Sequence, residues 1–273
     1  MEEVPAQLEI ETINGKQIVR RCLNPEIATY VTIPSPIVGI GDGAFIYNKQ
    51  LHSVVMNPEM EIIGRHAFEG CVSLTMVQLS HNLRSIGEAA FEDCALKEIQ
   101  LPPNLKEIGD SAFAFCKQME SIRIPDTVET IGKLCFDNCS ALRKVHLPET
   151  LKVIDMHTFM ECINLTNINL PQSLEAIEEL AFGKTGLMKV IIPEGVKRLG
   201  SHAFALCKHL EEVTIPNSVE KIIDDIFIYC NRLRTIYIPK GTTPWFEVML
   251  EGHENQFVEQ DNSVTKTPEQ TKF

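Results

Sequence analysis

Apolar residues recur along the chain with a period of 22 or 23 residues. An isoleucine or leucine stands five residues before each of nine evenly spaced phenylalanines. The phenylalanines are Phe45, Phe68, Phe91, Phe113, Phe136, Phe159, Phe182, Phe204 and Phe227. A fixed period of this length indicates that one short unit, which cannot bury its apolar face alone, is stacked on copies of itself. The chain is therefore predicted to form a solenoid.

Alignment on the phenylalanine gives the template I-G-x-x-A-F-x-x-C-x-x-L-x-x-I-x-L-P. Its last part alternates apolar and polar residues, as at Val145 and Leu147 before Pro148, which predicts a short strand that ends at the proline. Every repeat runs the same way, so equivalent strands can pair only in parallel, and nine of them extend about 40 Å. The A-F-x-x-C arc is expected to form a 3₁₀ or single α-helical turn.

The glycine of the template precedes the arc in six of the nine repeats. Glycine is favoured where the backbone needs a positive φ or approaches another segment closely. We expect this corner to need one or the other. Asp155, Glu178 and Ile223 replace the glycine elsewhere, so we assign it no functional role.

Both ends depart from the template. Asn14-Gly15 lies between two strand-like segments, which predicts a hairpin cap, and Thr243-Pro244 precedes the apolar residues Trp245 and Phe246, which predicts a helical cap. The predicted organisation is a hairpin cap at 1–28, a solenoid of about nine repeats at 29–240, a helical cap at 241–258 and a disordered tail at 259–273.

The charge of the chain limits the classes of partner that it can bind. The formal net charge of -12 and the pI near 5.2 disfavour nucleic acid and anionic membrane surfaces, which reward dense stripes of lysine and arginine. No apolar run reaches the ~20 residues of a membrane span, and the first residues do not resemble a secretory signal. A cytoplasmic location is expected; the alternative is a secreted or surface protein whose export signal is absent from this sequence.

Seven of the nine cysteines occupy one template position, which Asn48 and Thr185 fill in the other repeats. These seven are Cys71, Cys94, Cys116, Cys139, Cys162, Cys207 and Cys230. We interpret them as reduced, buried thiols. Disulfides between turns and metal binding are the alternatives, but an odd total with one cysteine per repeat fits neither.

The sequence contains no nucleophile elbow, Walker loop or H-E-x-x-H motif. His66, His157 and His202 share one template position but stand several repeats apart, too far to meet at one metal ion. We therefore expect no enzymatic activity, no catalytic residue, no metal and no cofactor.

The outward side chains of the predicted strands form an extended surface of the kind that solenoids use for binding. The candidate partner-binding residues are Gln78, Gln100, Arg123, Lys144, His146, Asn167, Asn169, Lys189, Thr214 and Tyr237. The middle of this surface is more basic than the chain as a whole, which points to an acidic protein partner. The alternative is a mixed, solvated surface without a partner.

The template, matched from about residue 30 to 240, resembles the BspA-like class of bacterial leucine-rich repeat proteins. The resemblance implies a β-rich, right-handed solenoid with parallel strands on its concave face, an N-terminal hairpin cap and a C-terminal helical cap. It also implies a non-enzymatic role. We expect a monomeric scaffold that binds a protein partner through the concave strand face; the alternative is a surface or secreted adhesin that attaches to host or other cell-surface proteins.

Overall fold

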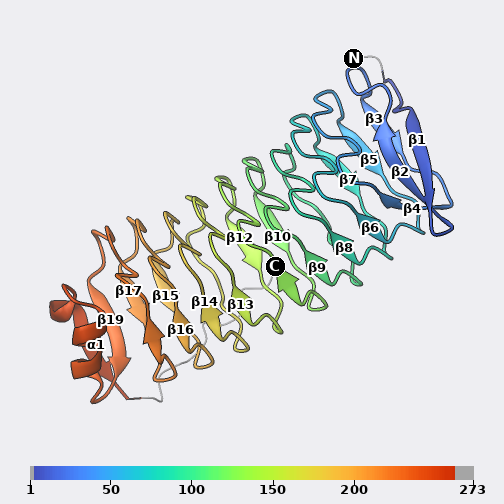
Figure 1. Cartoon of the computed structure of the whole chain (residues 1–273). Coiled ribbons are helices and arrows are strands. Elements are labelled where there is room, and N and C mark those ends of the chain that lie inside the picture. The colour runs from blue at the N-terminus through green and yellow to red at the C-terminus, as the bar shows by residue number, and fades with distance from the viewer. Residues whose placement is uncertain (1–2, 262–273) are drawn as a thin grey trace.

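The nine repeating phenylalanines lie one above the other through the interior of the molecule. In the computed structural model, which describes residues 3–261, adjacent rings are stacked with centroids 5.1 to 6.0 Å apart. Each of these side chains is at most 1% exposed. Each turn of the chain therefore covers the ring of the turn before it, and the result is an elongated right-handed solenoid (Figure 1).

The predicted strands form one side of the solenoid. They pair in parallel and in register, as Val31 does with Val54, and we call the surface made by their outward side chains the long-strand face. The strands are β3 (Tyr30–Thr32), β5 (Ser53–Val55), β7 (Met76–Gln78), β10 (Ser121–Arg123), β12 (Lys144–His146), β15 (Lys189–Ile191), β17 (Glu212–Thr214) and β19 (Thr235–Pro239).

The long-strand sheet has two interruptions. Near residue 100 only a single bridge from Gln100 to Arg123 is formed, and residues 167–169 are irregular. The sheet is thus divided into the groups β3-β5-β7, β10-β12 and β15-β17-β19. The first interruption lies in a 22-residue repeat, in which the turn before the strand is one residue shorter, and the second lies in the repeat just before the other 22-residue repeat.

A second parallel sheet, which the sequence did not predict, forms another side of the solenoid. Its strands end at the isoleucine or leucine five residues before each phenylalanine, and we call its outer surface the short-strand face. The strands are β4 (Ile37–Ile40), β6 (Ile62–Ile63), β8 (Ser85–Ile86), β9 (Glu107–Ile108), β11 (Thr130–Ile131), β13 (Val153–Ile154), β14 (Ala176–Ile177), β16 (Arg198–Leu199) and β18 (Lys221–Ile222). This sheet is interrupted between β11 and β13, where Asp155 replaces the glycine.

The template glycines allow successive turns to approach closely. None of them has a positive φ, so of the two expected reasons for glycine only close approach applies. A Cβ on Gly109 would lie 2.6 Å from the backbone nitrogen of Glu88, in the preceding turn, and a Cβ on Gly87 would lie 2.7 Å from that of Arg65. Close approach is therefore the reason for glycine.

The A-F-x-x-C arc is a series of turns, so the expected 3₁₀ or α-helical turn was wrong. Left-handed residues stand on both sides of the phenylalanine, as Ser111 (φ 53°) and Phe115 (φ 59°) do around Phe113. In this conformation the N–H of Phe113 donates to the carbonyl of Cys135 in the next turn, at 2.9 Å. The arc therefore adds a third line of hydrogen bonds between turns.

The repeated cysteines donate hydrogen bonds to this arc. The Cys116 thiol donates to the Phe91 carbonyl of the preceding turn, at 3.1 Å, and the same contact recurs at all seven positions. Thr185 instead donates to the Phe182 carbonyl at 2.9 Å, so this position needs a small buried donor. All nine cysteines are free and buried, and burial raises the pKa of the Cys116 thiol to about 12.

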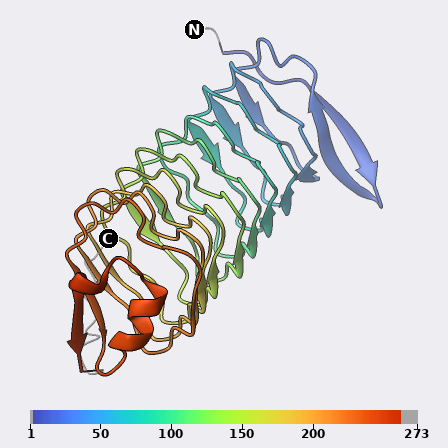
Figure 2. The same ribbon diagram turned by 60° about the vertical axis from the view of Figure 1, so that its left-hand side comes forward.

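An antiparallel hairpin covers the first turn. Its strands, β1 (Leu8–Ile13) and β2 (Lys16–Cys22), are joined by Asn14 and Gly15, both with positive φ, as the sequence predicted. Strand β2 pairs in parallel with β4, so the hairpin extends the short-strand sheet and projects from the first turns (Figure 2).

The last turn is covered by a short helix and a further strand. Helix α1 (Thr243–Met249) buries Phe246, a 3₁₀ turn (Glu254–Gln256) follows, and β20 (Phe257–Gln260) pairs in parallel with β19. The expectation that a disordered tail begins at residue 259 was therefore wrong for its first residues; positions 262–273 of that expected tail lie outside the described residues. No helix within residues 3–261 is long and apolar enough to cross a membrane.

We predict that Gly109→Ala lowers the free energy of unfolding by about 1–3 kcal/mol, because the added methyl group overpacks the contact with Glu88. Chemical denaturation measures this loss. Ser85→Ala, at an outward position of β8, is the control and should change stability by less than about 0.5 kcal/mol. Equal denaturation midpoints for Gly109→Ala and the native protein would contradict the role of close approach.

Candidate binding surfaces

The pairing of β10 with β12 places three basic side chains of the long-strand face next to one another. Arg123 lies directly opposite His146, and Lys144 lies opposite Ser121. Neighbouring strands are about 4.8 Å apart, so the three basic side chains share one small area. Arg123 and Lys144 are exposed, whereas His146 is half-buried. We call Arg123, Lys144 and His146 the basic cluster.

The protonation of His146 is coupled to this cluster. Partial burial lowers the pKa of His146, and the positive charge of Arg123 lowers it further, because both disfavour the charged imidazole. The carboxylates of Asp126 and Glu149 offset part of this shift. At neutral pH His146 is therefore mainly uncharged. Arg123 and Lys144 therefore carry the positive charge of the cluster.

Most other predicted residues are exposed, but they lie apart from the basic cluster in sequence and differ in their surroundings. Gln78 and Gln100 are exposed on the N-terminal side, and Asn167 and Asn169 are exposed in the irregular turn that follows β12. Lys189 lies on β15, where its ammonium pairs with Glu212 at 2.8 Å.

The C-terminal end of the predicted surface is less accessible. Thr214 is only 9% exposed, so its place among the exposed binding residues was wrong; its column neighbours are Ile191 and the half-buried Tyr237. Alternation along β17 points Thr214 outward, but the larger neighbours leave little of it for a partner.

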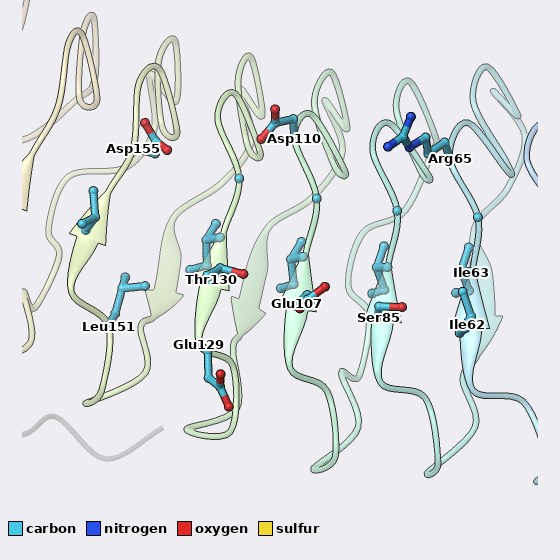
Figure 3. A pocket seen from close by; sticks show the side chains of 18 of the residues that line it. Ile62, Ile63, Arg65, Ser85, Glu107, Asp110, Glu129, Thr130, Leu151 and Asp155 are labelled. Carbon is cyan, nitrogen blue, oxygen red and sulfur yellow. The ribbon is translucent and has the colours of Figure 1, made fainter.

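The short-strand face carries a groove that the sequence did not reveal. It has a volume of about 890 Å³ and crosses β6, β8, β9, β11 and β13, five successive turns (Figure 3). The groove was missed because its strands were not predicted. The signal that could have found it is the residue just before each core isoleucine, which forms an outward column.

Polar and apolar groups line this groove in a defined order. The outward column consists of Ile62, Ser85, Glu107, Thr130 and Val153. Asp42, Arg65, Asp110 and Asp155 stand beyond the strand ends, and Figure 3 shows Arg65, Asp110 and Asp155 along one edge of the groove. Within residues 3–261 no group of three or more histidine, cysteine or acidic side chains could hold a metal ion.

Two parallel sheets, a phenylalanine column and the caps define a leucine-rich repeat solenoid. The model of the BspA-type leucine-rich repeat region matches residues 16–143 and 130–253, in six copies. The chain therefore belongs to the BspA-type leucine-rich repeat family. Repeats of this family generally serve protein interaction and are generally not enzymes.

Solved structures of bacterial proteins share the fold. A leucine-rich repeat protein from Bacteroides ovatus is 28% identical, with a TM-score of 0.67 over 87% of this chain and 70% of that chain. A leucine-rich repeat protein from T. pallidum is 27% identical, with a TM-score of 0.61 over 77% and 91% of the two chains. The pneumococcal vaccine antigen PcpA, 19% identical with a TM-score of 0.50 over 95% and 90%, shows similarity of fold alone. Comparison with curated proteins finds no match.

We predict that Arg123→Gln raises the pKa of His146 toward its ordinary value of 6.5, since one of the two causes of its depression is removed. An NMR titration of the imidazole signals measures the shift. Arg234→Gln, which removes an exposed cation elsewhere, should leave the His146 titration unchanged. The coupling is refuted if His146 titrates identically in the native protein and in Arg123→Gln.

Proposed function

We propose that this protein is a non-enzymatic scaffold that holds an acidic protein partner on its long-strand face. The observation that carries the proposal is the pairing of β10 with β12, which gathers Arg123, Lys144 and His146 on an exposed surface. The remaining outward residue of these strands is Ser121, so no carboxylate shares the outward positions of the two strands. An acidic surface would meet complementary charge here.

The surroundings of the basic cluster also suit protein recognition. Gln78 and Gln100 on one side and Asn167 and Asn169 on the other are uncharged and exposed, and their amides both donate and accept hydrogen bonds. They would add hydrogen bonds around a charged centre without repelling an acidic partner. Lys189 contributes less charge, because Glu212 already neutralises it.

Replacement of both exposed cations tests this surface. We expect the double variant R123E/K144E to retain the fold and to lose at least about 90% of the partner proteins that the native protein captures from a lysate, because like charges now face the partner. Quantitative mass spectrometry of the captured proteins gives the measurement.

The matched control is K197E/K221E, which makes the same change in charge at two exposed lysines outside the long-strand face. It should capture the same partners as the native protein. Identical partner sets for all three proteins, or equal losses in the two variants, would remove the long-strand face from the proposal.

We further propose that the protein works in a reducing compartment such as the cytoplasm, rather than as a surface or secreted adhesin. Nine free thiols support this location, because free cysteines persist where disulfides are kept reduced. Cys207 and Cys230 occupy the same template position in neighbouring turns, which are about 4.8 Å apart, so an oxidising compartment would present a pair that could be oxidised.

We predict that all nine thiols of the protein in its native cells are reduced. Cells are quenched in acid. The protein is then denatured near neutral pH, its thiols are labelled with a maleimide reagent of high mass, and the product is separated by size. The expected product carries the mass of nine labels. A product with two or more fewer labels, restored by prior treatment with a reductant, would show oxidised cysteines and favour the adhesin.

A further inference from the structure

We infer that the groove on the short-strand face is a second docking site, which takes a basic, extended segment of a partner protein. The site is independent of the long-strand face, since it lies on the other sheet and has the opposite charge. Four properties of the groove support this occupant: its length, its charge, the fixed position of its carboxylates and the order of its outward residues.

The length of the groove suits a segment of extended polypeptide. It crosses five successive turns, from Ile62 on β6 to Val153 on β13. At about 4.8 Å between neighbouring strands, four intervals span about 19 Å. An extended chain advances about 3.3 Å per residue, so about six residues lying along the solenoid axis would fill this length.

The groove is acidic. Its lining contains five carboxylates, namely Asp42, Glu107, Asp110, Glu129 and Asp155, against the two cations Arg65 and Lys152. This gives a formal charge of 2 - 5 = -3 in a protein whose net charge is -12. Lys152 is also engaged outside the groove by Glu175, at 2.8 Å, while Lys106 neutralises Glu129 at 2.9 Å.

Two rim carboxylates are held in place before any partner binds. Oδ1 of Asp42 accepts a hydrogen bond from the backbone N–H of Arg65 at 2.8 Å, and Oδ1 of Asp110 accepts one from the backbone N–H of Lys133 at 2.9 Å. Each aspartate thus reaches across to the next turn of the solenoid. Fixed carboxylates bind a cation without first losing side-chain freedom, which favours affinity.

The outward column predicts the pattern of the bound segment. Ile62 and Val153, at the two ends, are 50% and 36% exposed and offer apolar contact. Glu107 stands at the centre, between Ser85 and Thr130. A segment with apolar residues near both ends and lysine or arginine between them complements this order. Nucleic acids and anionic lipids would be repelled by the same carboxylates.

A synthetic peptide tests the site. The probe is a short fluorescein-labelled peptide with valine at each end and alternating lysine and serine between them, and fluorescence anisotropy measures its affinity for the full-length protein. We expect binding that weakens as salt is added. The same peptide with glutamate in place of lysine should not bind. Failure of the lysine peptide to bind would overturn the proposal.

Three variants separate groove binding from attraction to any acidic protein. E107Q/D110N keeps hydrogen-bond acceptors and should weaken binding at least about fivefold, whereas E211Q/E247Q removes two exposed carboxylates outside the groove and should change affinity less than about twofold. Thr130→Trp fills the groove without a change in charge and should weaken binding at least about fivefold. Equal effects of the two charge variants, or full affinity in Thr130→Trp, would overturn the site.

The long-strand variant R123E/K144E provides an independent comparison. Its cations lie on the other sheet, so it should bind the lysine peptide at least as tightly as the native protein does. Thermal unfolding followed by circular dichroism verifies that each variant is folded. Tighter peptide binding in R123E/K144E that persists when Thr130→Trp is added would place the peptide on the long-strand face, where the new carboxylates attract its lysines, and would contradict the groove.

Discussion

Hydrogen bonding between the backbones of neighbouring turns is the interaction on which the rest of the structure depends. Most strands of the array contain only two or three residues, and such strands are not stable without lateral partners. Three lines of bonds, in the two sheets and the arc, require every turn to approach the next closely. Gly109 permits this approach, Phe113 fills the space inside it, and Cys116 supplies a donor to a carbonyl at its border.

Repetition explains how much of the fold the sequence revealed. The phenylalanine and the strand residues that precede the proline recur in successive repeats, so the solenoid and the parallel pairing of its strands could be predicted. Both caps could be predicted because the sequence departs from the template at each end. The short-strand sheet was not predicted, because strands of two residues, such as Thr130 and Ile131, are too short to show alternation of apolar and polar residues. The conformation of the arc was not predicted, because its left-handed positions are occupied by many residue types, including leucine at Leu134, and not by the glycine or asparagine that usually indicates a positive φ.

The face that carries the basic cluster could be predicted from the sequence, whereas the burial of Thr214 and the groove could not. Alternation placed Arg123 and His146 on one face, and parallel register then brought them opposite each other. The burial of Thr214 depends on the bulk of side chains in adjacent turns, which alternation within one strand does not contain. The groove depends on a whole sheet, so its carboxylates could not be grouped before that sheet was known.

The interruptions of the two sheets are staggered along the rod. Between β11 and β13, where the short-strand sheet stops, β10 and β12 remain joined on the other side. Around residues 167–169 the reverse holds, since β13, β14 and β16 remain paired. At every turn along the rod, at least one of the two sheets is therefore continuous and can resist bending. Across the interruption between β11 and β13, the continuous pairing is that of β10 with β12, which carries Arg123 and His146. Mechanical continuity and the basic cluster thus coincide at the middle of the molecule.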